Sequence, residues 1–196
     1  MPRSIRRPRK LRLYNALQIG YLRNEAKQKN RLKRFGYRLD EELTTRERTV
    51  AYNPFTKKVI FIDNGTQITS PKDIVTDIAG IGLGRLDKTV RYAQNYDAYI
   101  KAKKKYDTPV TLVGHSLGGA EIAKIVAPED RAITYNGANI YQKPKSNVYN
   151  YRTRGDVFSS LANDAKTLQN PVSGLPRLNP IQPHNVSNIR DAPIFI

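Results

Sequence analysis

The chain has 196 residues, of which 39% are aliphatic or aromatic, and its formal net charge is +17. This length suits one domain with a substantial core, and the apolar fraction excludes wholesale disorder. Cysteine is absent, which excludes a disulfide framework, a thiolate metal site and a cysteine nucleophile, and leaves the redox compartment undecided.

Membrane insertion and secretion are not indicated by the sequence. No apolar run approaches the roughly 18 residues of a membrane-spanning helix, and no apolar stretch behind the basic N-terminus could serve as the core of a signal peptide. We expect a soluble chain that is not evidently secreted; association with a membrane surface or with a virus particle remains open.

Positive charge is concentrated at the N-terminus. Residues 1–38 hold 13 lysines and arginines and one acidic residue, a charge of +12, whereas the remainder holds 21 and 16. We expect residues 1–10 to be a disordered basic tail, and residues 1–38 to contact nucleic acid or an anionic membrane surface, because clustered cations release counterions from such partners. A solvated tail and a mitochondrial presequence are the alternatives.

The first elements after this tail are a helix and two strands. Leu13, Tyr14, Leu17 and Tyr21 recur at helical spacing and predict a basic helix over about residues 11–35, with Gly36 as its stop. The stretch "TVAYNPFTKKVIFIDNG" then predicts two strands around an Asn-Pro turn. After it, "SPKDIVTDI" predicts a helix start.

Strands and helices alternate through the rest of the chain. Helices are predicted over residues 87–106 and in "LGGAEIAKIVA" and "DVFSSLANDAKTL"; strands are predicted in "TPVTLVG", "RAITYNG", "SNVYNYRTRGD" and the terminal "APIFI"; residues 170–184 are predicted to be loop. This alternation predicts one α/β domain over residues 11–196, with a mostly parallel central sheet flanked by helices.

One short motif suggests catalysis. Gly114-His115-Ser116-Leu117-Gly118 fits the pattern G-x-S-x-G and lies between a predicted strand and a predicted helix. Such a sharp turn lifts a serine hydroxyl above the end of the sheet, and the flanking small residues let the backbone bend that tightly. Ser116 is therefore a candidate nucleophile; the alternative is a helix-capping serine in a glycine-rich turn.

A serine nucleophile needs a base, and the base needs a carboxylate to orient it. The chain has two histidines. His115 adjoins Ser116, so its ring should diverge from the hydroxyl, which leaves His184 as the base. Asp156 follows a predicted strand and completes the order Ser, Asp, His. Asp164, inside a predicted helix, and Asp191, after His184, compete with it, and Asp156 could instead be a helix N-cap.

These residues resemble the class 3 lipases of the α/β-hydrolase superfamily, from about Gly36 to His184. "GHSLGGA" is similar to the family's strongest signature, and "GDVFSSL" is similar to the segment that holds its aspartate. In that family a strand ends in Arg-Gly-Thr, whose threonine contributes to the oxyanion hole, and an acidic residue lies on the next helix. Asn64-Gly65-Thr66 resembles that element with asparagine in place of arginine, and Asp77 occupies the helix.

The resemblance implies an oxyanion hole made by the backbone N–H groups of Thr66 and Leu117, with two donors facing the negative oxygen of the tetrahedral intermediate. Asn64-Gly65 is also an ordinary turn dipeptide. A small lid or acyl-contact loop is expected in "AGIGLGRL", residues 79–86.

The function expected from the sequence is a cofactor-free serine hydrolase that cleaves carboxylic esters of acylglycerols or phospholipids. No metal or nucleotide is implied. The alternative, from another class, is a basic structural protein associated with nucleic acid or a virus particle that retains a hydrolase scaffold.

Overall fold

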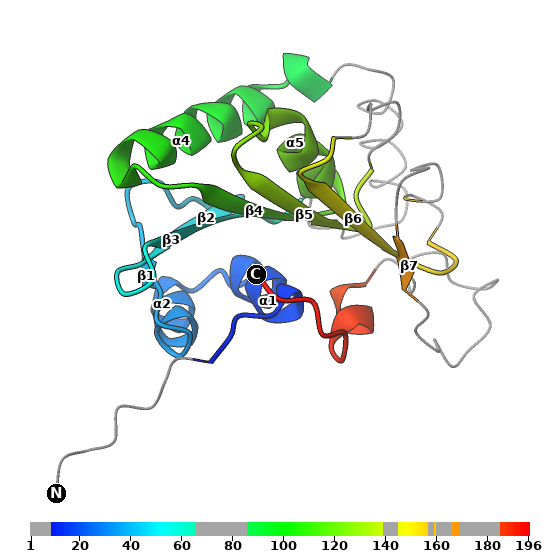
Figure 1. The fold of residues 1–196 in the computed structure, drawn as a ribbon, viewed down its shortest axis with the longest axis horizontal. Helices are drawn as coiled ribbons and strands as arrows, with labels where there is room; N and C mark the ends of the chain where they lie inside the picture. The colour runs from blue at the N-terminus through cyan, green and yellow to red at the C-terminus, as the bar shows by residue number, and fades with distance from the viewer. Residues whose placement is uncertain (1–8, 66–85, 139–144, 157–158, 160–165, 169–184) are drawn as a thin grey trace, which may run out of the picture.

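The computed structural model describes residues 9–65, 86–138, 145–156, 159 and 185–196, together with the backbone of residues 166–168. In this part of the chain a seven-stranded sheet is covered by helices on both faces (Figure 1). The expected α/β architecture with a mostly parallel sheet is confirmed.

The strands follow one another across the sheet in chain order. The first two, β1 (Arg38–Leu39) and β2 (Arg48–Asn53), are antiparallel to their neighbours, and β2 forms a hairpin with β3 (Lys58–Asp63). From β3 onward every pairing is parallel. The remaining strands are β4 (Val110–His115), β5 (Arg131–Tyr135), β6 (Val148–Thr153) and β7 (Lys166–Leu168).

Both faces of the sheet are buried, which explains the continuous apolar runs of its central strands. Successive side chains of a strand point to opposite faces. In β3, Ile60 and Ile62 pack in the cluster that contains α1 (Leu13–Gly20) and α2 (Glu25–Lys33), whereas Val59 and Phe61 pack in the cluster on the other face. That second cluster contains residues of α4 (Val90–Tyr106) and α5 (Leu117–Ile125).

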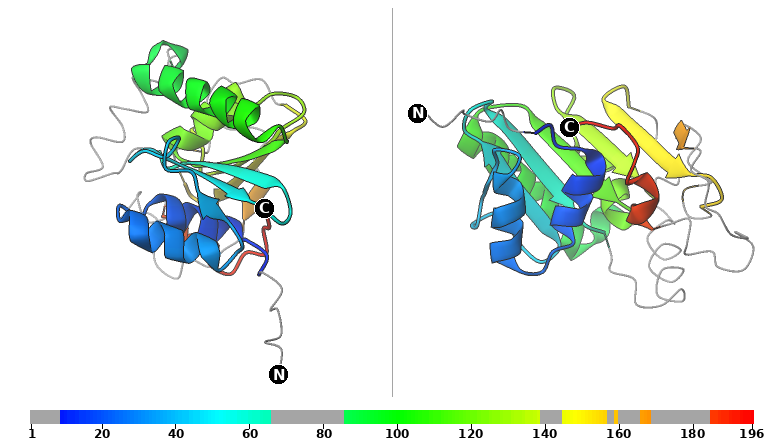
Figure 2. Two further views of the ribbon diagram at one scale, coloured as in Figure 1. Left: turned by 90° about the vertical axis from the view of Figure 1, so that its left-hand side faces the viewer. Right: turned by 90° about the horizontal axis from the view of Figure 1, so that it is seen from below.

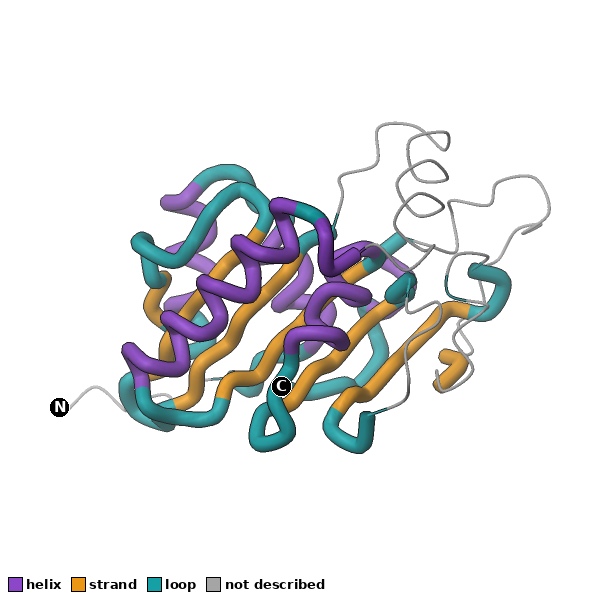
Figure 3. The backbone as a smooth tube through the Cα atoms, turned by 90° about the horizontal axis from the view of Figure 1, so that it is seen from above, coloured by secondary structure: helices purple, strands orange, loops and turns teal. Residues whose placement is uncertain are grey.

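Two views show these layers from the end and from above. Seen from the end, the sheet lies between α4 and α5 on one side and α1 and α2 on the other (Figure 2). Seen from above, α4 runs over the strands (Figure 3). Thr89 caps the N-terminus of α4, and its hydroxyl accepts a hydrogen bond from the Tyr92 amide at 3.1 Å. The last turn of α4 contains three lysines, whose positive charges interact favourably with the negative end of the helix dipole.

The predicted basic helix of residues 11–35 is two helices rather than one. Gly20 ends α1 against Asn64, whose amide donates to the Gly20 carbonyl at 2.6 Å. The chain then turns, and the Asn24 side chain caps α2 by accepting from the Lys27 amide at 2.9 Å. A contact with the sheet therefore interrupts a helical pattern that the sequence alone extends.

Two other sequence predictions differ from the structure. Residues 166–168, the end of the helix predicted at "DVFSSLANDAKTL", form a strand that pairs with β6, where Thr153 lies opposite Leu168. The terminal strand predicted at "APIFI" does not join the sheet. It pairs with the start of α1: the Leu13 amide donates to Ile194 at 2.8 Å, and the Ile196 amide donates to Leu11 at 3.0 Å.

Two short 3₁₀ helices, η1 (Leu86–Lys88) and η3 (Val186–Ile189), complete the described elements. Among the described residues, no helix has both the length and the apolar character needed to cross a bilayer. Residues 1–8, the helix predicted from Ser70, and residues 79–85 of the expected lid lie outside the described part.

Candidate active site

Ser116 connects β4 to α5 in a backbone conformation that is strained for any residue with a side chain. Its φ is 55° and its ψ is −126°. Asp107, which also has a positive φ, has a ψ of 49° and so lies in the common left-handed region. Ser116 lies outside that region, and such conformations persist where the surroundings impose them.

Hydrogen bonds on both sides hold this turn in place. The Ser116 amide donates to the Tyr135 carbonyl at 3.2 Å, and the Ser116 carbonyl accepts from the amides of Ala120 and Ala138, each at 3.2 Å. The serine is 2% exposed. Its position is therefore fixed by the neighbouring strand β5 and by the helix that it opens.

The two glycines of the motif are required by close backbone contact. A Cβ atom on Gly114 would lie 2.6 Å from the Gly118 carbonyl oxygen, and a Cβ on Gly118 would lie 2.5 Å from the Asp63 carbonyl oxygen. Real Cβ contacts are essentially never this short. The G-x-S-x-G pattern thus permits the end of β3, the serine turn and the first turn of α5 to touch.

Leu117, the first residue of α5, is the predicted oxyanion donor that the structure describes. The first four amides of an α-helix have no carbonyl partner within the helix, and they carry the positive end of its dipole. The Leu117 N–H belongs to this set and adjoins Ser116 in the chain. It is in a position to stabilise negative charge that develops beside the serine.

Thr66, the second predicted donor, lies outside the described residues. The residue before it, Gly65, packs against the serine turn, since a Cβ on Gly65 would clash with the His115 carbonyl oxygen and lie 3.3 Å from the Gly118 amide. Gly65 has a φ of 69°. The chain that continues into Thr66 therefore leaves β3 beside the serine.

Asp156 is buried two strands away from Ser116. It follows β6, and because β4, β5 and β6 are parallel, it comes from the same edge of the sheet as the serine. It is 2% exposed, and its Oδ2 accepts hydrogen bonds from the Ser159 amide at 3.1 Å and from the Ser159 hydroxyl. A bond to the amide three residues ahead is the pattern of an N-cap, the alternative role considered for this residue.

His184 lies outside the described residues, but its neighbour does not. The Asn185 carbonyl oxygen lies 3.3 Å from the Tyr135 hydroxyl, which also bonds to Thr153 at the end of β6. Burial raises the pKa of Tyr135 to about 12, and the charge of Asp156 adds to this shift. The segment next to His184 thus meets the sheet at Tyr135, within the electrostatic influence of Asp156.

His115 packs on the face of the sheet that α1 covers. Its Nδ1 lies 2.6 Å from the Tyr21 hydroxyl, and its ring stacks on Tyr135 with centroids 5.6 Å apart. Burial, with the charge of Asp63, raises the pKa of Tyr21 well above its ordinary value, so the hydroxyl keeps its proton. The ring of His115 is held by two tyrosines.

Asp63, Arg91, Asn95 and Glu121 form a polar cluster beside the serine turn that was not predicted from the sequence. Arg91 pairs with Asp63 and, through Nε at 3.0 Å, with Glu121. The Asn95 amide nitrogen lies 2.8 Å from Asp63 and 2.7 Å from Glu121. We name these four residues the carboxylate cluster. The sequence signal for it was Glu121 itself, an acid within the apolar stretch "GGAEIAKIV".

The carboxylate cluster connects Gly65, which precedes the predicted oxyanion donor Thr66, to α5, the helix that follows Ser116. Asp63 Oδ1 accepts from the Gly65 amide at 3.3 Å, and Glu121 lies one turn into α5. Desolvation, followed by the charge of Asp63, raises the pKa of Glu121 to about 8, and Arg91 opposes that shift. Burial and the charge of Asp63 thus favour the protonated form of Glu121, whereas the ion pair with Arg91 favours the ionised form.

Of the two acids that compete with Asp156, Asp191 is exposed on the α1 face of the sheet, and Asp164 lies outside the described residues. Among the described residues, no group of three or more histidine, aspartate or glutamate side chains is arranged to hold a metal ion.

Comparisons with known proteins yield one structural similarity. No protein-family model matches the sequence, and no curated protein matches it. The crystal structure of Lip2 lipase from Yarrowia lipolytica shares 16% identity, with a TM-score of 0.35, over 63% of this chain and 61% of that chain. At these values the similarity supports no conclusion about mechanism.

Proposed function

We propose that the chain is a serine hydrolase of the α/β-hydrolase type that cleaves carboxylic esters. The conformation of Ser116 carries this proposal. A capping serine has no need of a positive φ with a ψ of −126°, because a helix N-cap is normally extended. A nucleophile on a strand-to-helix turn does need it, since the turn presents the hydroxyl beside the free amides of the helix.

In the proposed reaction Ser116 Oγ attacks the ester carbonyl carbon while His184 takes the hydroxyl proton. The negative oxygen of the tetrahedral intermediate accepts from the N–H groups of Leu117 and Thr66. The intermediate collapses, the carbon–oxygen ester bond breaks, and the alcohol leaves with the proton from His184. Water then attacks the acyl-enzyme with the same base, and releases the carboxylic acid. Asp156 orients His184 and stabilises its charged form.

The proposed substrates are acyl esters of glycerol or of phospholipids. This assignment rests on the similarity of "GHSLGGA" and "GDVFSSL" to class 3 lipases. The position of Asn185 beside Tyr135 supports the choice of His184 as base, and the contact of Gly65 with the serine turn supports Thr66 as the second donor. The proposal requires no metal or cofactor.

The test is labelling by a fluorophosphonate probe together with hydrolysis of a short p-nitrophenyl ester. Ser116→Ala, His184→Ala and Asp156→Asn should each lower ester turnover by about 10³-fold or more, and the losses should not add, because the three residues act as one unit. Ser116→Ala should also abolish labelling.

His115→Ala is the matched control for the base. It should keep a substantial fraction of the activity, since Tyr21 and Tyr135 hold its ring. Undiminished turnover in folded Ser116→Ala would refute the proposed function. Equal losses in folded His115→Ala and His184→Ala would refute the assignment of the base.

A further inference from the structure

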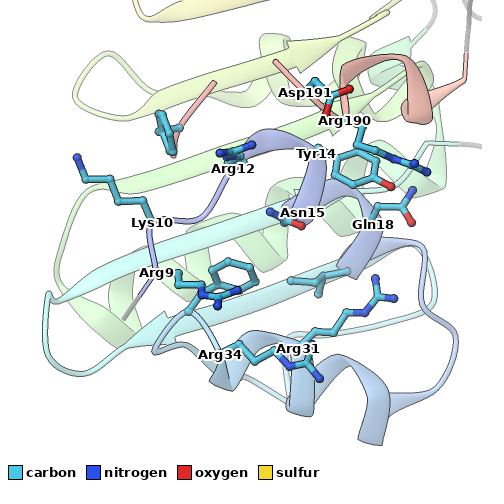
Figure 4. Close-up of a pocket in the computed structure, with 13 residues that line it drawn as sticks. Arg9, Lys10, Arg12, Tyr14, Asn15, Gln18, Arg31, Arg34, Arg190 and Asp191 are labelled. Carbon is cyan, nitrogen blue, oxygen red and sulfur yellow. The ribbon is translucent and has the colours of Figure 1, made fainter. Parts of the chain in front are cut away.

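A pocket of about 780 Å³ lies on the face of the sheet that α1 and α2 cover, and neither Ser116, Leu117 nor Asp156 lines it (Figure 4). Three described parts of the chain form its wall: the stretch before α1, the outer sides of α1 and α2, and the C-terminal segment. Among the described residues that line it are one acidic side chain, Asp191, and six cationic side chains: Arg9, Lys10, Arg12, Arg31, Arg34 and Arg190. We name it the arginine pocket.

The charge of the arginine pocket is not neutralised by the described protein. None of its six cations forms an ion pair within the described residues, whereas lysines elsewhere, such as Lys29, Lys103 and Lys105, pair with carboxylates. Figure 4 shows the side chains of Arg31 in α2, Arg34 directly after it, Arg12 directly before α1 and Arg190 in the C-terminal segment, all of which line the pocket. Guanidinium groups gathered in this way favour binding of phosphate groups.

Aromatic rings lie among these cations. Phe195, 41% exposed, has Lys10 and Arg12 within 6 Å of its ring centroid, at 5.9 and 5.7 Å. Arg190 lies 5.9 Å from the ring centroid of Tyr14, and Phe35 also lines the wall. Arginines that neutralise phosphates beside aromatic rings that stack on bases are the two components of single-strand recognition.

A membrane surface fits this pocket less well. A planar bilayer contacts protruding surfaces, and an interfacial helix turns its apolar residues outward. Here the apolar residues of the helices, Leu13 and Leu17 in α1 and Leu32 in α2, are buried in the core. The outward surface is concave and cationic, which favours an extended polyanion that enters it.

The cationic character continues along the chain beyond the pocket. Arg9 lines the wall, and three more arginines precede it in the sequence, Arg3, Arg6 and Arg7. We propose that the arginine pocket binds single-stranded nucleic acid, with phosphates on its arginines and a base on Phe195.

The test measures binding of the full chain to a fluorescent oligothymidylate of about 16 nucleotides, between about 50 and about 200 mM salt. Replacing Arg31 and Arg34 together by alanine should weaken binding about tenfold or more. It should also reduce the salt slope, the steepness with which the logarithm of the binding constant falls with the logarithm of the salt concentration, by about 1.4, or about 0.7 per lost phosphate contact. The control replaces Lys58 and Lys104, exposed residues of β3 and α4, and removes the same charge.

The aromatic contact is tested separately. Phe195→Leu should weaken binding about fivefold, which corresponds to the smallest loss of affinity expected when one base loses its stacking partner. The salt slope should not change, because no charge is removed. Phe55→Leu is the control, because Phe55 is 81% exposed in the β2–β3 turn. Thermal unfolding of each variant verifies that it folds.

Three results would overturn the proposal. Equal weakening by the Lys58/Lys104 control would show that net charge, not the pocket, determines binding. Equal affinity for a duplex of the same length would exclude recognition of unstacked bases. Binding to vesicles that contain phosphatidylserine, lost in the pocket variants, without binding to the oligonucleotide would assign the pocket to lipid. None of these results bears on ester hydrolysis, so this proposal and the proposed function fail independently.

Discussion

The backbone conformation of one residue, Ser116, distinguishes the proposed catalytic turn from a purely structural one. Its φ and ψ of 55° and −126° have the opposite signs to those of an extended residue. Residues with a side chain favour the extended conformation, whereas glycine adopts either form. Holding a serine there costs about 1–3 kcal/mol of stability. Such a cost is expected at a site where geometry serves function.

This strain leads to a prediction about stability. Ser116→Gly should be more stable than Ser116→Ala, by about 1 kcal/mol, although glycine normally destabilises through the entropy of the unfolded chain. Both variants should lack ester turnover, because both lack the hydroxyl. Denaturant unfolding measures the difference; a more stable alanine variant would show that the Ser116 conformation is not strained.

Glu121 provides the second prediction at this scale, a pH dependence. Its pKa is raised from 4.5 to about 8 in the folded chain by burial and by Asp63. The folded state then binds one proton more than the unfolded state between these values, so the free energy of unfolding decreases as pH rises from about 4.5 to about 8.

Glu121→Gln keeps the shape of the side chain and removes the titration. Its stability relative to the wild type should rise with pH across that window and level off above it. Thermal unfolding of both proteins at several pH values measures this difference, in which the titration of groups common to both proteins cancels. Parallel curves would mean that Glu121 is ionised in the folded protein.

At the level of elements, the site is made where β3, β4 and α5 meet. The parallel pairing of Asp63 with Gly114 aligns the ends of the two strands, and the first turn of α5 touches both. Asp63 then bonds to the Gly65 amide and to Arg91, so one carboxylate connects the residue before Thr66 to α5 through the carboxylate cluster.

Gly118→Ala tests how closely these elements must approach. Alanine in place of glycine normally stabilises a helix by about 1 kcal/mol. Here the new Cβ would lie 2.5 Å from the Asp63 carbonyl oxygen, so we expect a net loss of about 1–3 kcal/mol and a strong loss of turnover. Urea unfolding and ester hydrolysis measure the two effects; a stabilised, active variant would contradict the described contact.

For the whole molecule, the two ends of the described chain meet on the α1 face of the sheet. Hydrogen bonds join Leu13 to Ile194 and Leu11 to Ile196, and the 3₁₀ helix η3 contributes Val186 and Ile189 to the core cluster around α1. This junction builds one wall of the arginine pocket from residues that are more than 170 positions apart.

Deletion of residues 1–8 tests whether this part of the basic tail contributes to stability, to ester hydrolysis or to binding of nucleic acid. The described core begins at Leu11, which is 3% exposed, so the truncated chain should keep its stability and its hydrolysis of a short ester. If its three arginines contact phosphates, the salt slope for oligothymidylate should fall by about 2. An unchanged slope would show that the tail contributes solubility only, and lost ester turnover would place it in the catalytic domain.

The sequence by itself determined the features that have a local physical cause. Alternation of apolar runs predicted the order of the described strands and helices from "TVAYN" to "NVYNYR", because periodicity follows from backbone geometry. Glycine spacing located the turn around Ser116, because only small residues permit so sharp a bend. The same local reasoning extended one helix through Asn24 and another into residues 166–168, where the structure has a break and a strand.

Only the tertiary structure decided which distant residues meet. The break at Gly20 depends on Asn64, the strand at residues 166–168 depends on the free edge of β6, and the carboxylate cluster joins β3, α4 and α5. The arginine pocket likewise joins residues near both ends of the chain. Contacts of this kind arise from the packing of whole elements, and packing leaves no periodic trace in the sequence of either partner.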